Sequence, residues 1–195
     1  MSRPQVPIIP VPALIEAYAQ GRFPMCHDDG ELYWHDPDPR AVFPLGSIQP
    51  NARLRRALRK CNFSISMDRD LESVIRGCAD REETWIDQRV IGSYIALHKA
   101  GYVHSVEVTT DQKLVGGIYG VALGGAFFGE SMFSRRSHAG KAAFFALVQH
   151  LNAKGFVLFD SQYINAFTEQ LGAVEIPRSE FRSRLQQALV MRVQF

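Results

Sequence analysis

The middle of the chain restricts the fold most, because three strand-like segments follow one another with very few residues between them. His104–Thr110, Lys113–Leu123 and Ala126–Phe133 are rich in β-branched and aromatic residues. Asp111-Gln112 separates the first two segments, and Gly124-Gly125 separates the last two. Both pairs are typical of tight hairpin turns. The sequence therefore predicts a three-stranded antiparallel meander.

The segments around this meander predict a mixed sheet. A helix pattern over 139–153 ends at Gly155, and the apolar segment 156–162 that follows it resembles a central strand. A further strand is expected at 63–67. Helices are expected at about 13–20, 51–60, 68–79, 87–100, 166–171 and 179–189. A meander followed by a helix and a parallel strand is the plan of the acetyltransferase-like (GNAT-like) α+β fold, and by this analogy of pattern we predict that fold class.

The charge distribution favours a division of the chain near residue 62. Residues 1–62 hold eight Lys or Arg against six Asp or Glu, whereas residues 63–195 hold fourteen of each. We therefore expect a small N-terminal domain over 1–62 and a larger second domain over 63–195. In the first of these, turn-forming residues predict an irregular segment at 23–30, and three prolines argue against regular structure at 35–44.

The composition also narrows the function classes. No apolar run approaches the roughly 20 residues that a membrane span needs. Cys26, Cys61 and Cys78 contain no Cys-x-x-Cys spacing, and no two histidines have helical ligand spacing, so neither a metal site nor a disulfide framework is predicted. A reducing cytoplasm is the expected location.

Three polar residues stand out within apolar surroundings. Glu130 follows Ala-Phe-Phe-Gly, while Asp160 and Gln162 end a strand that begins Phe-Val-Leu-Phe. A spacing of two predicts that Asp160 and Gln162 share one face of that strand. They are candidates for a site, although Asp160 could instead hold the following loop in place. A serine triad is disfavoured, since Ser131 has no histidine on its element.

A set of motifs then relates the chain to a known family. They are Gly21-Arg-Phe-Pro-Met25, Tyr33-Trp34, Asp36-Pro-Asp-Pro-Arg-Ala-Val42, Asp80-Arg-Glu-Glu-Thr-Trp-Ile86, His104-Ser-Val-Glu107, Leu114-Val-Gly-Gly-Ile-Tyr-Gly120, Gly129-Glu-Ser-Met-Phe-Ser-Arg135, Phe159-Asp-Ser-Gln162 and Leu171-Gly-Ala-Val-Glu-Ile-Pro-Arg178. On these motifs, which occur in the family's order over most of the chain, the sequence resembles leucyl/phenylalanyl-tRNA–protein transferases.

The resemblance implies a tRNA-dependent aminoacyl transfer. Leucine or phenylalanine would move from Leu-tRNA or Phe-tRNA to the α-amino group of proteins that begin with Arg or Lys, and the product would be an N-degron. It also implies that the small N-terminal domain (1–62) faces the tRNA, that 63–195 form an acetyltransferase-like catalytic domain, and that no metal or coenzyme takes part. The sequence does not fix the preference between Leu and Phe, and a monomer is the working expectation.

The resemblance further assigns catalytic roles. Asp160 would polarise Gln162, which would hydrogen-bond the attacking amine. Alternatively, Gln162 only orients the amine or the ester carbonyl, and a water molecule accepts the proton. Glu130 would lie near the positive acceptor terminus or the aminoacyl amine.

The same comparison suggests residues for binding, each with a plainer alternative. The apolar pocket for the donor side chain would use Ile118, Phe127, Met132, Phe144 and Phe159, any of which could be ordinary core. Trp34 and Trp85 would stack on the terminal adenosine. The segment 51–60 contains five basic residues and no acid, and would contact tRNA phosphates. The basic residues are Arg53, Arg55, Arg56, Arg59 and Lys60.

One departure from the family and two rival functions remain. Where the family often has Asn-Asp-His-Thr, this chain has Asn165-Ala-Phe-Thr168, which lacks two polar side chains. An acetyl-CoA-dependent N-acetyltransferase is one rival, but Arg135–Lys141 does not supply a clear coenzyme loop. A non-catalytic tRNA-binding or N-terminus-binding module is the other, and intact Glu130, Asp160 and Gln162 argue against it.

Overall fold

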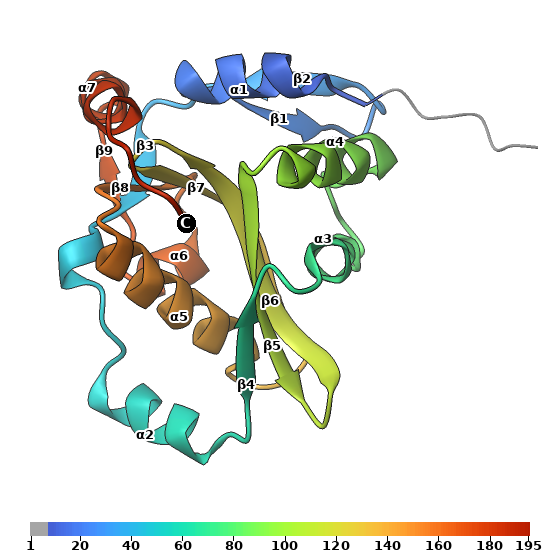
Figure 1. Cartoon of the computed structure of the whole chain (residues 1–195), viewed down its shortest axis with the longest axis vertical. Coiled ribbons are helices and arrows are strands. Elements are labelled where there is room, and N and C mark those ends of the chain that lie inside the picture. The colour runs from blue at the N-terminus through green and yellow to red at the C-terminus, as the bar shows by residue number, and fades with distance from the viewer. Residues whose placement is uncertain (1–7) are drawn as a thin grey trace, which may run out of the picture.

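The computed structural model describes residues 8–195 and contains a mixed sheet of seven strands with helices on both faces (Figure 1). The strands lie in the order β4-β5-β6-β7-β8-β3-β9. In this sheet β7 and β8 run parallel, and the other neighbouring strands run antiparallel. This confirms the α+β class with a mixed sheet and flanking helices, whereas the specific acetyltransferase-like plan stays a prediction.

The elements have the following bounds. The large sheet contains β3 (Arg40–Phe43), β4 (Ser64–Met67), β5 (Val103–Thr110), β6 (Lys113–Leu123), β7 (Ala126–Ser134), β8 (Leu158–Gln162) and β9 (Val174–Ile176), and a separate hairpin contains β1 (Phe23–Cys26) and β2 (Leu32–His35). The helices are α1 (Val11–Ala19), η1 (a 3₁₀ turn, Leu45–Ser47), α2 (Ala52–Lys60), α3 (Leu71–Ala79), α4 (Gln88–Lys99), α5 (Ala139–Lys154), α6 (Ala166–Gln170) and α7 (Arg178–Leu189). The predicted meander is confirmed as β5-β6-β7, and the predicted parallel strand is confirmed as β8.

The core lies in two layers, one on each face of the sheet. Figure 1 shows α5 on one face and α3 and α4 on the other. Apolar side chains of α1, α3, α4 and α7 form one cluster, and those of α5 and η1 form the second. The glycines of β6 permit this close approach: a Cβ on Gly116 would lie 2.7 Å from the Cβ of Ala139. Gly116 therefore serves the packing of α5 on the sheet, and a Cβ on Gly117 would likewise lie 3.0 Å from Val74 of α3.

Two predictions of irregular chain are wrong. Phe23–Cys26 forms β1, where Pro24 is tolerated because the hairpin has only two strands. Arg40–Phe43 forms β3, which pairs with β8 on one side and β9 on the other. Pro39 and Pro44 flank β3 without entering it, so their missing N–H groups remove no hydrogen bond from the ladder.

The N-terminal segment contributes to more than one part of the molecule. Its helix α1 and hairpin β1-β2 lie together at one end, and α2 lies at the opposite end with no buried residue (Figure 1). Between them, β3 is part of the large sheet. The domain division at residue 62 stays a prediction. In residues 8–195, no helix has both the length and the apolar character needed to cross a membrane.

Candidate active site

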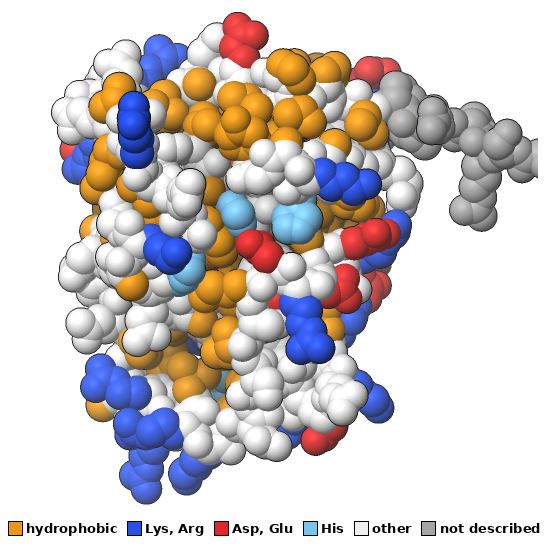
Figure 2. All heavy atoms as spheres, viewed as in Figure 1, with side chains coloured by type: hydrophobic (Ala, Val, Ile, Leu, Met, Phe, Trp, Pro, Cys, Tyr) orange, Lys and Arg blue, Asp and Glu red, His pale blue; other side chains and the backbone are white. Residues whose placement is uncertain are grey.

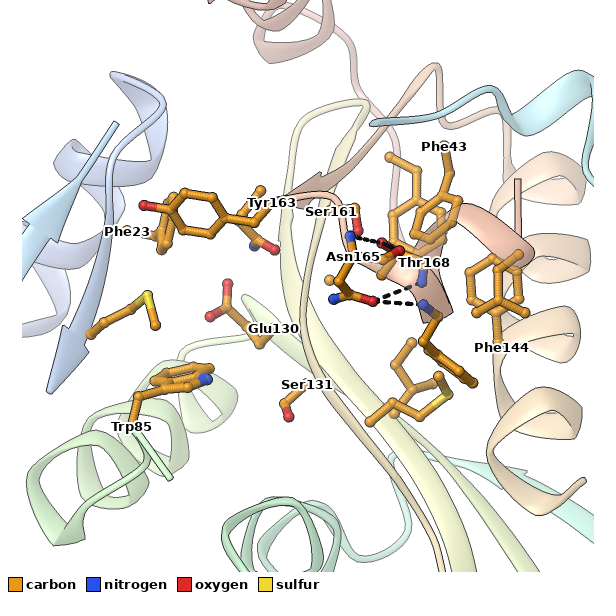
Figure 3. A pocket seen from close by; sticks show the side chains of 18 of the residues that line it. Phe23, Phe43, Trp85, Glu130, Ser131, Phe144, Ser161, Tyr163, Asn165 and Thr168 are labelled. Carbon is orange, nitrogen blue, oxygen red and sulfur yellow. Dashed lines mark hydrogen bonds between the residues drawn. The ribbon is translucent and has the colours of Figure 1, made fainter. Parts of the chain in front are cut away.

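A cavity of about 440 Å³ opens where the sheet, the β1-β2 hairpin and the segment after β8 meet. Its volume is in the range of sites that hold small molecules. Figure 3 shows Phe43 and Phe144 on one side of it and Phe23 and Trp85 on the other. Most of its lining is apolar. Its charged residues are Glu130 and Arg81, which have opposite signs, and Tyr163 also lines it. The cavity thus combines an apolar interior with very few charges.

Glu130 projects from β7 into this cavity, between Trp85 and Tyr163 in Figure 3. Its Oε1 accepts a hydrogen bond from the Tyr18 hydroxyl at 2.7 Å, and its Oε2 accepts one from the Tyr94 hydroxyl at 2.8 Å. The two tyrosine hydroxyls also hydrogen-bond each other. Burial raises the pKa of Glu130 to about 7, although both tyrosine contacts oppose the rise.

The number of protons in this group shows which form of Glu130 can satisfy all of its contacts. Glu130, Tyr18 and Tyr94 make three mutual contacts, but the two hydroxyls supply only two protons. A neutral Glu130 carboxylic acid would supply the third: it would donate to one tyrosine instead of accepting from it, that tyrosine would donate to the other, and the other would donate back to Glu130. The protonated form therefore completes a closed ring of hydrogen bonds, and the ionised form leaves one contact without a proton.

Asp160 lies outside the cavity lining and is fully buried in a contact with Arg40 of β3. Arg40 Nε and Nη2 donate to the two carboxylate oxygens at 2.8 and 2.6 Å. A third donor, the backbone N–H of Gln162, reaches Asp160 Oδ1 at 3.0 Å. Burial alone would lower the pKa of the Arg40 guanidinium, but the Asp160 charge outweighs it and raises that pKa. Asp160 is thus held as a compensated carboxylate that binds the backbone of Gln162.

Gln162 lines the cavity and has an unusual backbone conformation. Its φ is 59°, in the left-handed region that side chains other than glycine rarely adopt. The Tyr163 N–H donates to the Ser161 carbonyl at 2.7 Å, which closes a three-residue turn around Gln162. The alternation expected for a strand therefore ends at Gln162, and its buried Nε2 has no hydrogen-bond partner in the described chain.

The structure brings most of the predicted pocket residues together. Four of the five lie along the cavity: Ile118, Met132, Phe144 and Phe159. Phe127 does not line it, and packs instead behind Phe159 at a ring distance of 5.6 Å. Trp85 lines the cavity, whereas Trp34 lies on the exposed β2 with 41% of its surface accessible. The roles of these residues stay predictions.

The segment that departs from the family is nevertheless well ordered by hydrogen bonds. Asn165 caps α6: its Oδ1 accepts from the backbone N–H groups of Phe167 and Thr168, and Thr168 Oγ1 accepts from the Asn165 N–H at 2.9 Å. Figure 3 shows these bonds at the cavity wall. The loop geometry at this position therefore does not depend on the two polar side chains that the chain lacks.

The basic residues of 53–60 lie on α2, apart from the cavity. Figure 2 shows Lys and Arg side chains gathered at the end of the molecule where α2 lies in Figure 1. In residues 8–195 no acidic side chain forms a salt bridge with any of them. Arg53 lines a groove together with His138 and Lys141 at the start of α5, and Leu171 lines both this groove and the cavity.

Sequence reasoning missed three residues of the site, namely Tyr18, Tyr94 and Arg40. The tyrosines lie on the apolar stripes of predicted helices, where they cannot be told from core. Arg40 precedes Ala-Val-Phe, and a lone arginine beside an apolar run could have indicated a buried charge. For metals, no three His, Cys, Asp or Glu side chains of the described residues converge as a ligand set.

Comparison with known proteins identifies the family. The family described as leucyl/phenylalanyl-tRNA protein transferase matches residues 42–186, and its N-terminal domain matches residues 9–38. Curated proteins named leucyl/phenylalanyl-tRNA–protein transferase align over nearly the whole chain. The one from Gloeobacter violaceus is 51% identical over 93% of this chain and 95% of its own length, and the one from Chlorobium luteolum is 46% identical over 96% and 100%.

Solved structures resemble the chain only weakly. L-PGS from Bacillus licheniformis aligns with a TM-score of 0.46 and 12% identity over 76% of this chain and 56% of its own, a likeness too small to support an argument. The sequence matches do not have this weakness, since they cover both the sheet and the N-terminal hairpin. The chain belongs to the leucyl/phenylalanyl-tRNA–protein transferase family.

Proposed function

We propose that this protein transfers a leucyl or phenylalanyl group from charged tRNA to the α-amino group of proteins that begin with Arg or Lys, and so creates an N-degron. The observation that carries the proposal is the cavity, whose apolar interior suits a large hydrophobic side chain and whose polar edge holds Glu130 and Gln162. Family membership supplies the reaction class. We place this activity in the cytoplasm, because charged tRNA is the donor.

The donor is already an activated ester, so the reaction needs no covalent enzyme intermediate and no coenzyme. The acceptor nitrogen forms a bond with the ester carbonyl carbon, the bond from that carbon to the ribose oxygen breaks, and the ribose oxygen takes up a proton. The acceptor α-ammonium must lose protons along this path. The protein therefore has to align ester and amine and to provide a proton acceptor.

Glu130 is the proposed proton acceptor. It lines the cavity, and its pKa of about 7 lies close to that of a protein α-amino group, about 8, which favours proton transfer between the two. Before transfer its negative charge attracts the acceptor ammonium. After transfer the neutral acid completes the hydrogen-bond ring with Tyr18 and Tyr94.

Asp160 and Gln162 have different roles in this scheme. Asp160 lies outside the cavity lining and is paired with the charged Arg40 guanidinium, so we assign Asp160 to holding the Gln162 backbone rather than to taking a proton. The Gln162 carboxamide, which lines the cavity, orients the ester carbonyl or the attacking amine.

The tRNA is proposed to lie across the cavity and α2. Trp85 at the cavity and the exposed Trp34 offer stacking surfaces for the terminal adenosine. The groove beside Arg53, His138 and Lys141 shares the lining residue Leu171 with the cavity, and phosphates of the acceptor stem would follow it to the α2 arginines.

A single assay tests the proposal. The protein is mixed with a peptide that begins with Lys and with either labelled Leu-tRNA or labelled acetyl-CoA. We expect label on the peptide only from Leu-tRNA, and none when the peptide's α-amino group is acetylated beforehand. Label that appears only from acetyl-CoA would contradict the proposal.

A further inference from the structure

Tyr163 lines the cavity immediately after the strained turn at Gln162, and its partner His35 on β2 lies outside the lining. The Tyr163 hydroxyl hydrogen-bonds His35 Nδ1 at 2.8 Å, and this contact joins the segment after β8 to strand β2, across 128 positions of sequence. The His35 ring also stacks on Phe23, a residue that lines the cavity, with 5.6 Å between the ring centres.

Both nitrogens of His35 are engaged. Its Nε2 lies 2.9 Å from Nε2 of His27, and the two imidazole rings stack at 5.1 Å. Because a neutral imidazole has one donor and one acceptor nitrogen, a proton on either nitrogen of His35 satisfies both contacts. The contact with His27 and the stacking on Phe23 therefore fix the His35 ring, so that it can hold the Tyr163 hydroxyl in one place.

The turn needs such support. A residue other than glycine in the left-handed region costs on the order of 1–3 kcal/mol, and persists only where its surroundings enforce it. On the N-terminal side of Gln162, Asp160 accepts the Gln162 N–H and is itself fixed by Arg40. On the C-terminal side, the Tyr163 side chain is 44% exposed and is held by its hydroxyl contact and by an edge contact with Phe23.

We propose that the His35–Tyr163 hydrogen bond clamps the C-terminal side of the Gln162 turn, so that His35 and Tyr163 are positioning residues for the Gln162 carboxamide. Asp160 and Arg40 form the matching clamp on the N-terminal side. The inference rests on the proposed function for its kinetic consequence, but the clamp itself is a property of the free protein.

The test compares two tyrosines that are about equally exposed and whose hydroxyls each have one side-chain partner, but that lie at different positions. Tyr163→Phe removes the hydroxyl at the clamp. Tyr33→Phe removes a hydroxyl from the β1-β2 hairpin, which also carries His35. Tyr33 is 46% exposed, and its hydroxyl donates to Asp29 at 2.8 Å. We expect Tyr163→Phe to lower kcat for leucyl transfer by roughly tenfold, with KM for Leu-tRNA nearly unchanged, because a misplaced group loses rate rather than binding. Tyr33→Phe should transfer at the rate of the unaltered protein.

A double-variant cycle separates positioning from general destabilisation. In a Gln162→Ala background, Tyr163→Phe should cause no further loss of kcat, because the group that it positions is absent. His35→Ala combined with Tyr163→Phe should be no slower than the slower of the two single variants, since both remove one hydrogen bond. An equal loss from Tyr163→Phe with and without the Gln162 side chain would overturn the proposal, as would an equal effect of Tyr33→Phe.

A measurement without substrate distinguishes failure of the clamp from failure of the proposed function. Amide hydrogen exchange at Tyr163, whose N–H closes the turn, should accelerate in Tyr163→Phe and not in Tyr33→Phe. Unchanged exchange would refute the clamp even in an active enzyme. Accelerated exchange in a protein that transfers no leucine would leave the clamp standing and reject the proposed function instead.

Discussion

Glu130 shows how a few atoms set the chemistry of the cavity. Two tyrosine hydroxyls from α1 and α4 hold its carboxyl, and burial raises its pKa to about 7. Near neutral pH the group is therefore divided between a form that attracts an ammonium ion and a form that completes the tyrosine ring. Small changes in pH or in one hydroxyl should alter this balance.

The rate of transfer should follow the ionisation of Glu130. Because only the carboxylate attracts the ammonium and can take its proton, kcat/KM for the acceptor peptide should rise with pH up to about 7, with a tenfold loss for each pH unit below that. Glu130→Gln should transfer slowly and lack this acidic limb. The measurement is a pH profile at saturating Leu-tRNA, and an unchanged acidic limb in the variant would assign it to another group.

The same carboxyl should link pH to stability. Its pKa in the folded protein, about 7, exceeds the ordinary value of 4.5, so the folded state binds this proton more tightly than the unfolded state. The stabilisation is therefore complete below pH 4.5 and is lost as the pH rises to about 7. Glu130→Gln should gain in free energy of unfolding relative to the unaltered protein between pH 5 and 8 in urea titrations. A difference that stays constant over this range would contradict the raised pKa.

Asp160 should contribute to the stability of the folded protein, in addition to any effect on the rate of transfer. Asp160→Asn leaves the buried Arg40 charge without its partner, which typically lowers the free energy of unfolding by about 3–5 kcal/mol. Glu72→Gln is the control, because its contact with Arg76 is exposed and should contribute less than about 0.5 kcal/mol. Urea unfolding of both variants provides the comparison, and equal stabilities would show that Arg40 finds another partner.

At the scale of elements, local patterns predicted the longer segments and missed the shorter ones. The strands of the meander, α2 with its Asn51 cap, and α5 ending at Gly155 all agree with the sequence. Strands β1, β3 and β9 have only four, four and three residues, and prolines lie within β1 and on both sides of β3, whereas the equally short β4 was predicted at 63–67. Each missed strand forms by pairing with another: β1 with β2, and β3 with both β8 and β9.

Helix α2 is the element proposed to contact tRNA phosphates, and this proposed role rests on its surface charge. Replacing Arg55, Arg56 and Arg59 by Gln keeps helix propensity and removes three charges, so tRNA affinity should fall whatever the tRNA sequence, and the slope of log affinity against log salt should decrease by roughly two to three. The preference between Leu and Phe should not change.

A matched triple variant provides the control for α2. Arg182 and Arg184 lie on α7, at the end of the molecule opposite α2, and Arg192 follows α7 along the chain; replacement of all three by Gln removes the same charge. It should leave the salt slope nearly unaltered. Equal slopes for the two triple variants would place the acceptor stem away from α2.

At the scale of the whole molecule, the cavity exists because distant segments meet. Its wall combines the β1-β2 hairpin, the meander, α5 and the chain after β8. Phe159 of the wall contacts two other lining rings, Phe43 and Phe144, at ring distances of 4.9 and 5.9 Å, and Phe127 behind the wall at 5.6 Å. Residues of one apolar cluster can therefore differ in role according to whether they reach the cavity.

Donor selection should separate these roles. Met132 lines the cavity, so Met132→Ala should reduce the preference for Leu-tRNA over Ala-tRNA, by roughly 1–3 kcal/mol. Phe127 is buried in the same cluster but does not line the cavity, so Phe127→Ala should lower the melting temperature and leave that preference unchanged. The ratio of transfer rates from the two tRNAs is the measurement, and equal effects of both substitutions would contradict the assignment.

The sequence by itself determined the class of the fold and the members of much of the site. Alternating and helical patterns act over a few residues, so the meander, its helices and the end of β8 at Asp160 and Gln162 could be predicted from neighbours along the chain. Only the tertiary structure determined which residues the polar side chains of the site contact. Arg40 meets Asp160 across 120 positions, and Tyr18 meets Glu130 across 112. Such contacts depend on which faces pack together, and that is fixed when the whole chain buries its apolar surface and must pair the polar groups caught inside.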